Sequence, residues 1–142
     1  MKKSNNNAAS FFMIKTSPEG HTQENYASNK KAREAALHHF NQCQLPAVVG
    51  KVGATSFSVL GSRVNDLSEY IEMVNGYELQ AFTHIKALHE VYFAYCQEEL
   101  KRIGKRTTSR EQAQRNADEH YNNTGGPDGG HYTVIETIVK GQ

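Results

Sequence analysis

In the middle of the chain stands Ala47-Val-Val-Gly-Lys-Val-Gly53, followed closely by Thr55-Ser-Phe-Ser-Val-Leu60. The β-branched and aromatic residues of both runs predict two short strands, or one strand with a glycine bulge. Gly50 and Gly53 also allow another backbone or a ligand to come close. A sheet therefore passes through the centre of the chain, and the elements on either side must pack against it.

Two elements are expected before this sheet. Ser10-Phe-Phe-Met-Ile-Lys-Thr16 is short, apolar and aromatic, and it predicts a buried strand, with a polar loop after it as far as Asn25. A helix is expected from Ser28 to about Gln42. Its apolar side chains recur at helical spacing, at Ala32, Ala36 and Phe40.

Three elements are expected directly after the central strands. Residues 65–73 predict a short turn or helix, and the alternation in Tyr77-Glu-Leu-Gln-Ala-Phe82 predicts a half-buried strand. The longest helix is expected from a cap at Thr83 to Gly104. Its expected apolar face consists of Ile85, Leu88, Tyr92, Tyr95, Cys96 and Ile103.

The last third of the chain is more polar. Thr108-Ser-Arg-Glu111 has the pattern of a capping box and predicts a helix to about Tyr121, placed on the surface because its apolar stripe is narrow. Residues 122–130 are rich in Asn and Gly and predict a flexible turn. Tyr132 to Val139 predicts a final strand.

This order of elements predicts an α+β fold. A mainly antiparallel sheet would carry two helices on one face, in a ferredoxin-like arrangement, with an extra surface helix near the C-terminus. A chain of 142 residues suits one domain. We therefore expect a disordered tail over residues 1–8 and a single α+β domain over residues 9–142.

Composition narrows the functional classes. Sixteen Lys and Arg face fifteen Asp and Glu, so nucleic acid is an unlikely partner, although a local basic patch is expected at Lys101, Arg102, Lys105, Arg106 and Arg110. No run approaches the ~20 apolar residues of a membrane span, and we expect a cytoplasmic protein without a membrane partner. Cys43 and Cys96 are expected to be buried free thiols, and neither a metal site nor a cofactor is expected.

Two motifs suggest chemistry only weakly. His131-Tyr-Thr133 has the form used by two-histidine phosphoesterases, but that chemistry needs two copies and no second one is present. The glycine-rich run at residues 125–130 leads into a predicted strand, whereas a phosphate-binding loop leads into a helix. A strand-edge histidine and a flexible turn are the simpler interpretations.

Carboxylates gather near aromatic residues between the central strands. Glu69, Glu72 and Glu78 lie close in sequence to Tyr70 and Tyr77. Such charges are usually solvated turn residues, but carboxylates beside aromatic rings also suit a cationic ligand.

The order of features over about residues 11–100 resembles that of the S-adenosylmethionine-degrading enzymes of phages. The features that carry the resemblance are Phe11-Phe-Met-Ile14, the basic helix ending at Phe40, Pro46-Ala-Val-Val-Gly-Lys-Val52 with Thr55 after it, the pair Ala87-Leu88, and the acidic Glu98 and Glu99. The resemblance implies a ferredoxin-like fold and a homotrimer. It also implies cleavage of S-adenosylmethionine to methylthioadenosine and homoserine lactone, a reaction in which the protein mainly positions the substrate.

The resemblance also implies site residues and a biological setting. The family glutamate maps best onto Glu72, with Glu69 as the alternative, and the candidate substrate-binding residues are Gly53, Thr55, Tyr70 and Tyr77. Such an enzyme would act in the host cytoplasm against restriction-modification. The chain departs from the family where a tyrosine is expected near Gly61, and residues 107–130 have no counterpart.

A second hypothesis belongs to a different class. The chain would be a non-enzymatic phage or bacterial inhibitor that binds a host or defence protein through its basic segment around Arg102 and the polar helix that follows. The absence of a catalytic signature favours this alternative.

Overall fold

The computed structural model describes residues 10–61, 68–82, 84–99, 101–124 and 131–142. In this part of the chain one antiparallel sheet has the strand order β2-β1-β3-β4-β7-β5-β6. The α+β class with a mainly antiparallel sheet is therefore confirmed. The strands are β1 (Phe11–Ser17), β2 (Gly20–Tyr26), β3 (Ala47–Lys51), β4 (Ser56–Leu60), β5 (Ile85–Cys96), β6 (Lys101–Thr107) and β7 (His131–Gly141), and the helices are α2 (Asn29–Cys43), α3 (Ser68–Gly76) and α4 (Arg110–Thr124).

Side chains that alternate along the strands form a core on each face of the sheet. On β1, Phe12 and Ile14 pack with Met73 and Val74 of α3. The intervening Met13 packs on the other face, in the cluster that includes Ala32, Ala36 and Leu37 of α2. The period-two alternation of strands thus places α2 and α3 on opposite faces.

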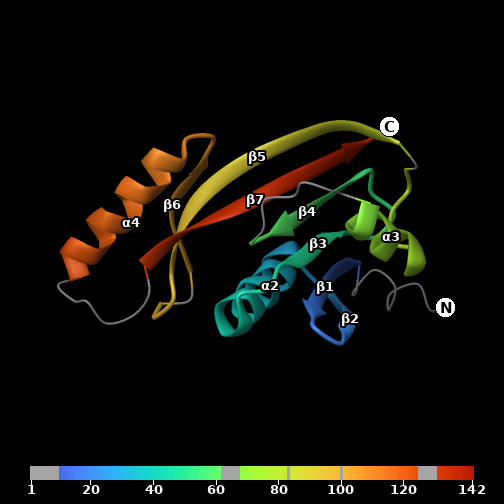
Figure 1. Cartoon of the computed structure of the whole chain (residues 1–142), viewed down its shortest axis with the longest axis horizontal. Coiled ribbons are helices and arrows are strands. Elements are labelled where there is room, and N and C mark those ends of the chain that lie inside the picture. The colour runs from blue at the N-terminus through green and yellow to red at the C-terminus, as the bar shows by residue number, and fades with distance from the viewer. Residues whose placement is uncertain (1–9, 62–67, 83, 100, 125–130) are drawn as a thin grey trace.

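The helix α4 packs near the β6 end of the sheet. Its buried stripe consists of Ala113 and Ala117, and Gln114 accepts a hydrogen bond from Thr133 of β7 at 3.0 Å. Thr133 alternates with the buried Val134, which packs in the α2 cluster, so α4 covers the face opposite to α2. Figure 1 shows α4 and β6 at one end of the long β5–β7 ribbon, and α3 near its other end.

The expected long helix over residues 83–104 is wrong, because this segment forms β5 and β6. Residues 91–96, Val-Tyr-Phe-Ala-Tyr-Cys, form a continuous run rich in β-branched and aromatic side chains, buried from Tyr92 onward. Such a run is typical of a strand covered on both faces, here by α2 and α4. The helical spacing of Ile85, Leu88 and Tyr92 was coincidental, since Leu88 is exposed.

Two further expectations are corrected. The polar segment expected as a loop before Asn25 is β2, an edge strand paired with β1. Edge strands need not be apolar, so the hydrophobic pattern did not reveal it. The strand expected over Tyr77–Phe82 is absent from the described sheet, and the segment makes only an isolated parallel bridge between Gln80 and Ala54.

Other predicted elements are confirmed. The helix α2 forms where it is expected, and Ser28 caps it by accepting a hydrogen bond from the backbone of Lys31 at 3.2 Å. The helix α4 also forms, but its cap is Ser109, which accepts from the backbone of Gln112 at 3.1 Å, one residue after the Thr108 of the expected capping box. The helix α4 is less superficial than expected, because the alanine stripe is fully covered by the sheet. Of the two cysteines, Cys96 is buried as expected, whereas Cys43 is exposed.

Several expectations fall on residues that the structure does not describe. These are the disordered tail, the first residues of the segment 65–73, the cap at Thr83 and the glycine turn at 125–130. No helix in the described part of the chain is long and apolar enough to cross a membrane.

Candidate functional site: a basic cleft

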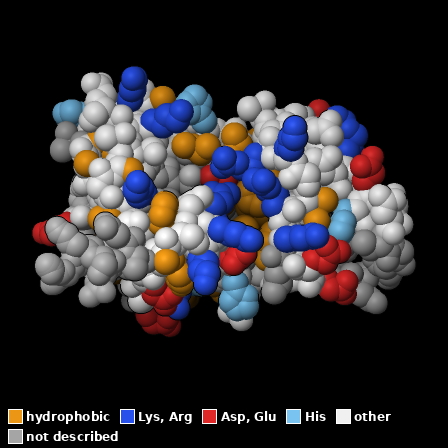
Figure 2. Space-filling model, turned by 180° about the vertical axis from the view of Figure 1, so that it is seen from behind, with side chains coloured by type: hydrophobic (Ala, Val, Ile, Leu, Met, Phe, Trp, Pro, Cys, Tyr) orange, Lys and Arg blue, Asp and Glu red, His pale blue; other side chains and the backbone are white. Residues whose placement is uncertain are grey.

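A cleft of about 680 Å³ opens between α2 and the strands on the α2 face of the sheet. Its apolar floor includes Leu37, Val49 and Phe93, all of them buried. Its charged lining comes from elements far apart in the sequence, with Lys30, Arg33 and Glu34 from α2, Lys51 from β3, Lys101, Arg102 and Arg106 from β6, and Glu136 from β7. Figure 2 shows Lys and Arg side chains gathered near the middle of this face, around hydrophobic side chains.

The position of each charged group follows from its element. Arg33 lies four residues before Leu37 on α2, at the edge of the helix stripe that faces the sheet. Glu136 lies on β7 between Val134 and Ile138, so its side chain points to the same face. Arg106 comes from β6, the edge strand, which pairs with β5.

The fully buried carboxylate of Glu136 binds two arginines. Arg33 donates in bidentate fashion, with Nη2 2.8 Å from Oε1 and Nη1 3.0 Å from Oε2. Arg106 Nη1 lies 3.0 Å from both carboxylate oxygens. Charge-assisted bonds of this kind fix the planes of both guanidinium groups.

The environment of Glu136 favours its ionised form. Burial alone raises the pKa of a carboxyl group, but the hydrogen bonds and charge of Arg33 act in the opposite direction, together with a hydrogen bond from Ser58 and the charge of Arg106. The pKa of Glu136 is therefore held below its ordinary value. The carboxylate remains charged at neutral pH and keeps the two arginines in place.

The other cations of the cleft are not neutralised in this way. Lys30, Lys51 and Arg102 are exposed, and within the described residues no carboxylate lies in ion-pair distance of them. Lys101 binds Glu99, which lies outside the cleft lining, at 3.2 Å. The cleft therefore combines two fixed arginines, free positive charge at its rim and an apolar floor, which suits an anionic ligand with an apolar part.

The site residues predicted from the sequence lie elsewhere. Glu69 and Glu72 are exposed on α3, and neither contributes to the cleft lining. Tyr70 is buried in the core beneath α3. Tyr77 is partly buried, with its hydroxyl 3.0 Å from Nδ1 of His21.

Of the predicted set, Gly53 and Thr55 share the turn between β3 and β4. The amide of Gly53 donates to the carbonyl of Leu79 at 2.8 Å, so the turn after β3 lies against the segment after α3. Gly53 and Thr55 are both exposed on this turn, and the amide of Gly141 donates to the carbonyl of Thr55.

A second group of chemically active side chains lies on the opposite face of the sheet. Cys96, Glu99 and His120 each offer one metal-ligand atom, and these atoms all lie within 4.8 Å of one another. This is the group among the described residues that has the composition of a metal site.

Sequence reasoning missed the cleft because its charges come from α2, β6 and β7. The expected basic patch around Arg102 was correctly noticed, but it was assigned to a helix end, which separates it from Arg33 and Glu136. A single acidic residue, Glu136, within the apolar run from Val134 to Val139 was the available signal. A charge in a strand with apolar neighbours on both sides is buried and needs a partner.

Neither a protein-family model nor a curated protein nor a solved structure matches this chain.

Proposed function

We propose that the basic cleft binds a phosphorylated small molecule that also carries an apolar or aromatic group, with a nucleotide as the representative ligand. The observation that carries the proposal is the pair Arg33 and Arg106, fixed by the buried Glu136 beneath free cations. Arginine guanidinium groups match the geometry of phosphate oxygens, and their fixed positions reduce the ordering that binding requires.

The size and lining of the cleft support a small ligand. Its volume of about 680 Å³ is within the range of roughly 300–1,000 Å³ that is usual for small-molecule pockets. The phosphate would contact Arg33 and Arg106 together with the rim cations Lys30, Lys51 and Arg102. The apolar part would cover Phe11 and Ile138, which line the cleft and are only partly buried. Because the whole chain has a formal charge of only +1, the attraction is concentrated at this cleft rather than spread over the surface.

Thermal unfolding with a graded set of ligands tests this proposal. Adenosine, AMP, ADP and ATP share the apolar base and differ in phosphate number. Because a ligand that binds only the folded state raises its stability by mass action, the midpoint should rise by several degrees with ATP and progressively less with ADP and AMP. A midpoint that adenosine raises as much as ATP does, or that no ligand raises, would contradict the proposal.

Degradation of S-adenosylmethionine is a second proposal, and it carries with it the ferredoxin-like arrangement and the homotrimer that the family resemblance implies. The observation in its favour is the hydrogen bond from the amide of Gly53 to the carbonyl of Leu79, which holds the turn of Gly53 and Thr55 against the segment that begins at Tyr77. In this reading Glu72, or Glu69, holds the charged end of the substrate, and the surface near Gly53, Thr55 and Tyr77 contacts the remainder.

Chromatography separates the two proposals. Incubation with S-adenosylmethionine should yield methylthioadenosine, and Glu72→Gln should abolish this product while leaving the midpoint shift with ATP unchanged. Lack of product at high protein concentration would remove the lyase proposal and would leave the cleft proposal intact. If both assays fail, the remaining hypothesis is a non-enzymatic inhibitor that binds a host or defence protein. The surface of β6 and α4 is then the region to test for binding to an acidic protein partner.

A further inference from the structure

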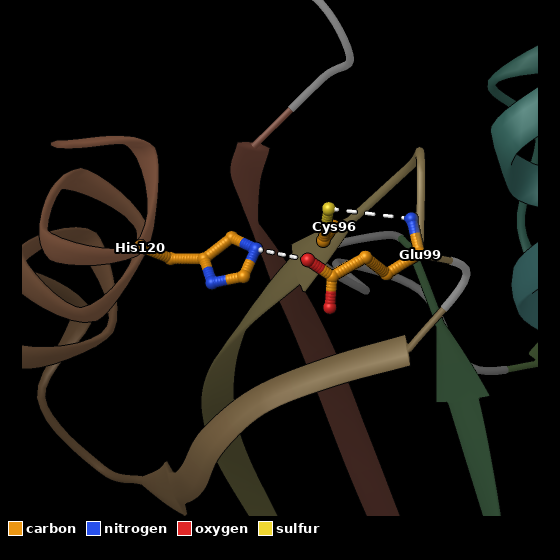
Figure 3. Close-up of side chains that lie close together, drawn as sticks. All are labelled: Cys96, Glu99 and His120. Atoms are coloured by element: carbon orange, nitrogen blue, oxygen red, sulfur yellow. Dashed lines mark hydrogen bonds and ion pairs between the residues drawn. The ribbon is translucent and has the colours of Figure 1, made fainter. Parts of the chain in front are cut away.

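Three metal-binding side chains meet where the turn between β5 and β6 approaches α4 (Figure 3). Cys96 ends β5, Glu99 lies in the turn, and His120 comes from α4. His120 Nε2 lies 3.1 Å from Oε2 of Glu99, and the backbone amide of Glu99 donates to Sγ of Cys96 at 3.4 Å.

We propose that Cys96, Glu99 and His120 bind a divalent transition metal ion, with Zn²⁺ as the natural occupant. Thiolate, imidazole and carboxylate are the ligand types that zinc uses in proteins, and three protein ligands leave a fourth position for water or a substrate atom. The two ionised groups, thiolate and carboxylate, balance the charge of the ion.

The geometry is close to what a zinc ion requires. Zinc bonds of about 2.0–2.3 Å place neighbouring ligand atoms of a tetrahedron roughly 3.3–3.6 Å apart. The three atoms already lie within 4.8 Å of one another, so shifts of roughly 1 Å complete the site. Glu99 lies in a turn, where such a shift needs no change in the sheet.

Neighbouring groups support the ligands. Lys101 Nζ lies 3.2 Å from the other carboxylate oxygen of Glu99 and orients this side chain from outside the site. The backbone amide of Glu99 donates to the sulfur of Cys96 and so holds Sγ beside the turn that carries the carboxylate.

The site lies on the face opposite to the basic cleft, because Cys96 alternates on β5 with Tyr95, which packs in the α2 cluster. The proposal is therefore independent of the ligand proposed for the cleft. A variant that loses metal binding can therefore still bind a ligand in the cleft, and the reverse also holds.

Cobalt substitution tests the site directly. The 142-residue chain is treated with a chelator and titrated with Co²⁺, whose tetrahedral thiolate complexes show sulfur-to-metal charge transfer and intense visible bands. We expect saturation at one equivalent per chain, loss of the charge-transfer band in Cys96→Ser, and at least a tenfold weaker affinity in His120→Gln. Added Zn²⁺ should displace Co²⁺ and remove the spectrum.

The chain provides a matched control. Cys43 is exposed, and its Sγ lies 3.4 Å from Nε2 of His39. These two residues form the second Cys–His pair in the part of the chain that the structure describes. Cys43→Ser should retain the full cobalt spectrum. A band that disappears in Cys43→Ser and persists in Cys96→Ser, or a wild type that gives no band, would overturn the proposal. Far-ultraviolet circular dichroism establishes that each variant is folded, and His120→Gln keeps the test valid if Cys96→Ser does not fold.

Discussion

At the scale of single residues, Glu136 is the group on which the cleft depends. Its carboxylate is fully buried and holds Arg33 and Arg106 at 2.8–3.0 Å. A buried charge without partners lowers the stability of the folded state. Removal of the carboxylate also lowers it, because two arginine charges are then left side by side without their partner. The same three side chains therefore contribute to folding stability and to the ligand binding proposed for the cleft.

Replacing Glu136 with Gln keeps the shape of the side chain and removes its charge. We expect the free energy of unfolding to fall by about 2–3 kcal/mol, which is less than the ~3–5 kcal/mol for a fully buried pair because both arginines are partly exposed. Urea unfolding at pH 7 measures the change. Glu34→Gln, at an exposed residue of the same cleft, is the control and should change the stability by less than about 0.5 kcal/mol. Equal stability of Glu136→Gln and wild type would show that the network contributes nothing to folding.

The depressed pKa of Glu136 also predicts a pH dependence. Because the folded protein holds this pKa below the ordinary value of 4.5, the carboxylate contributes its full stabilisation above about pH 4.5. The contribution is lost as the pH falls through the lower folded pKa. The difference in urea midpoint between wild type and Glu136→Gln should therefore be large at pH 7 and shrink below pH 4, whereas a difference independent of pH would contradict this assignment.

At the scale of elements, α4 is attached to the sheet by small side chains. Ala113 and Ala117 are covered completely, so the helix lies close to β5 and β7. A larger side chain in this stripe must push the helix away, because there is no space to receive it.

We therefore expect Ala117→Leu to destabilise the protein by about 1–3 kcal/mol. Arg115→Leu places the same side chain on the exposed face of the helix and should be close to neutral. Differential scanning calorimetry compares the two variants. If both variants have the melting temperature of the wild type, the alanine stripe of α4 is not packed tightly against the sheet.

The elements that sequence predicted are those with strong local signals. The strands β1, β3 and β4 and the helix α2 carry β-branched, aromatic or periodic apolar residues, and α4 follows the capping-box pattern at Thr108–Glu111. The failures have physical reasons. The edge strand β2 is polar, so its sequence lacks an apolar strand pattern. The segment of β5 contains apolar residues at helical spacing, but its burial between α2 and α4, a tertiary effect, determines that it forms a strand.

The candidate sites were less predictable than the fold. Glu72, with Glu69 as the alternative, is a candidate through the family resemblance and through its nearness in sequence to aromatic residues, and both glutamates lie exposed on α3. The cleft depends on strand order, because β7 lies between β4 and β5 and brings Glu136 between α2 and β6. The cluster of Cys96, Glu99 and His120 likewise needs α4 to lie beside the β5–β6 turn, and only the short spacing of Cys96 and Glu99 was visible in the sequence.

At the scale of the whole molecule, the sheet separates two sites of different chemistry. One face carries the basic cleft under α2, and the other carries the side chains of Cys96, Glu99 and His120 beside α4. A ligand in the cleft would contact positive charges from α2, β3 and β6 together, and would therefore connect strands that are not neighbours in the sheet.

Salt should weaken binding in the cleft. The free cations at Lys30, Lys51 and Arg102 are exposed, and ions screen such charges over a Debye length of about 10 Å at 0.1 M. We expect the dissociation constant of ATP to rise severalfold between 50 and 300 mM salt, measured by fluorescence competition. An affinity that does not change with salt would argue against charge as the source of binding.

The most direct measurement is a calorimetric titration of ATP into wild type, Arg102→Glu and Lys105→Glu. Both residues are exposed cations on β6, but Arg102 lines the cleft and Lys105 does not. Because hydrogen bonds to charged groups contribute about 1.5–3 kcal/mol, Arg102→Glu should weaken binding by roughly 10- to 100-fold, and Lys105→Glu should bind nearly as well as wild type. Equal losses in the two variants, or no binding by the wild type, would contradict a phosphate-binding cleft.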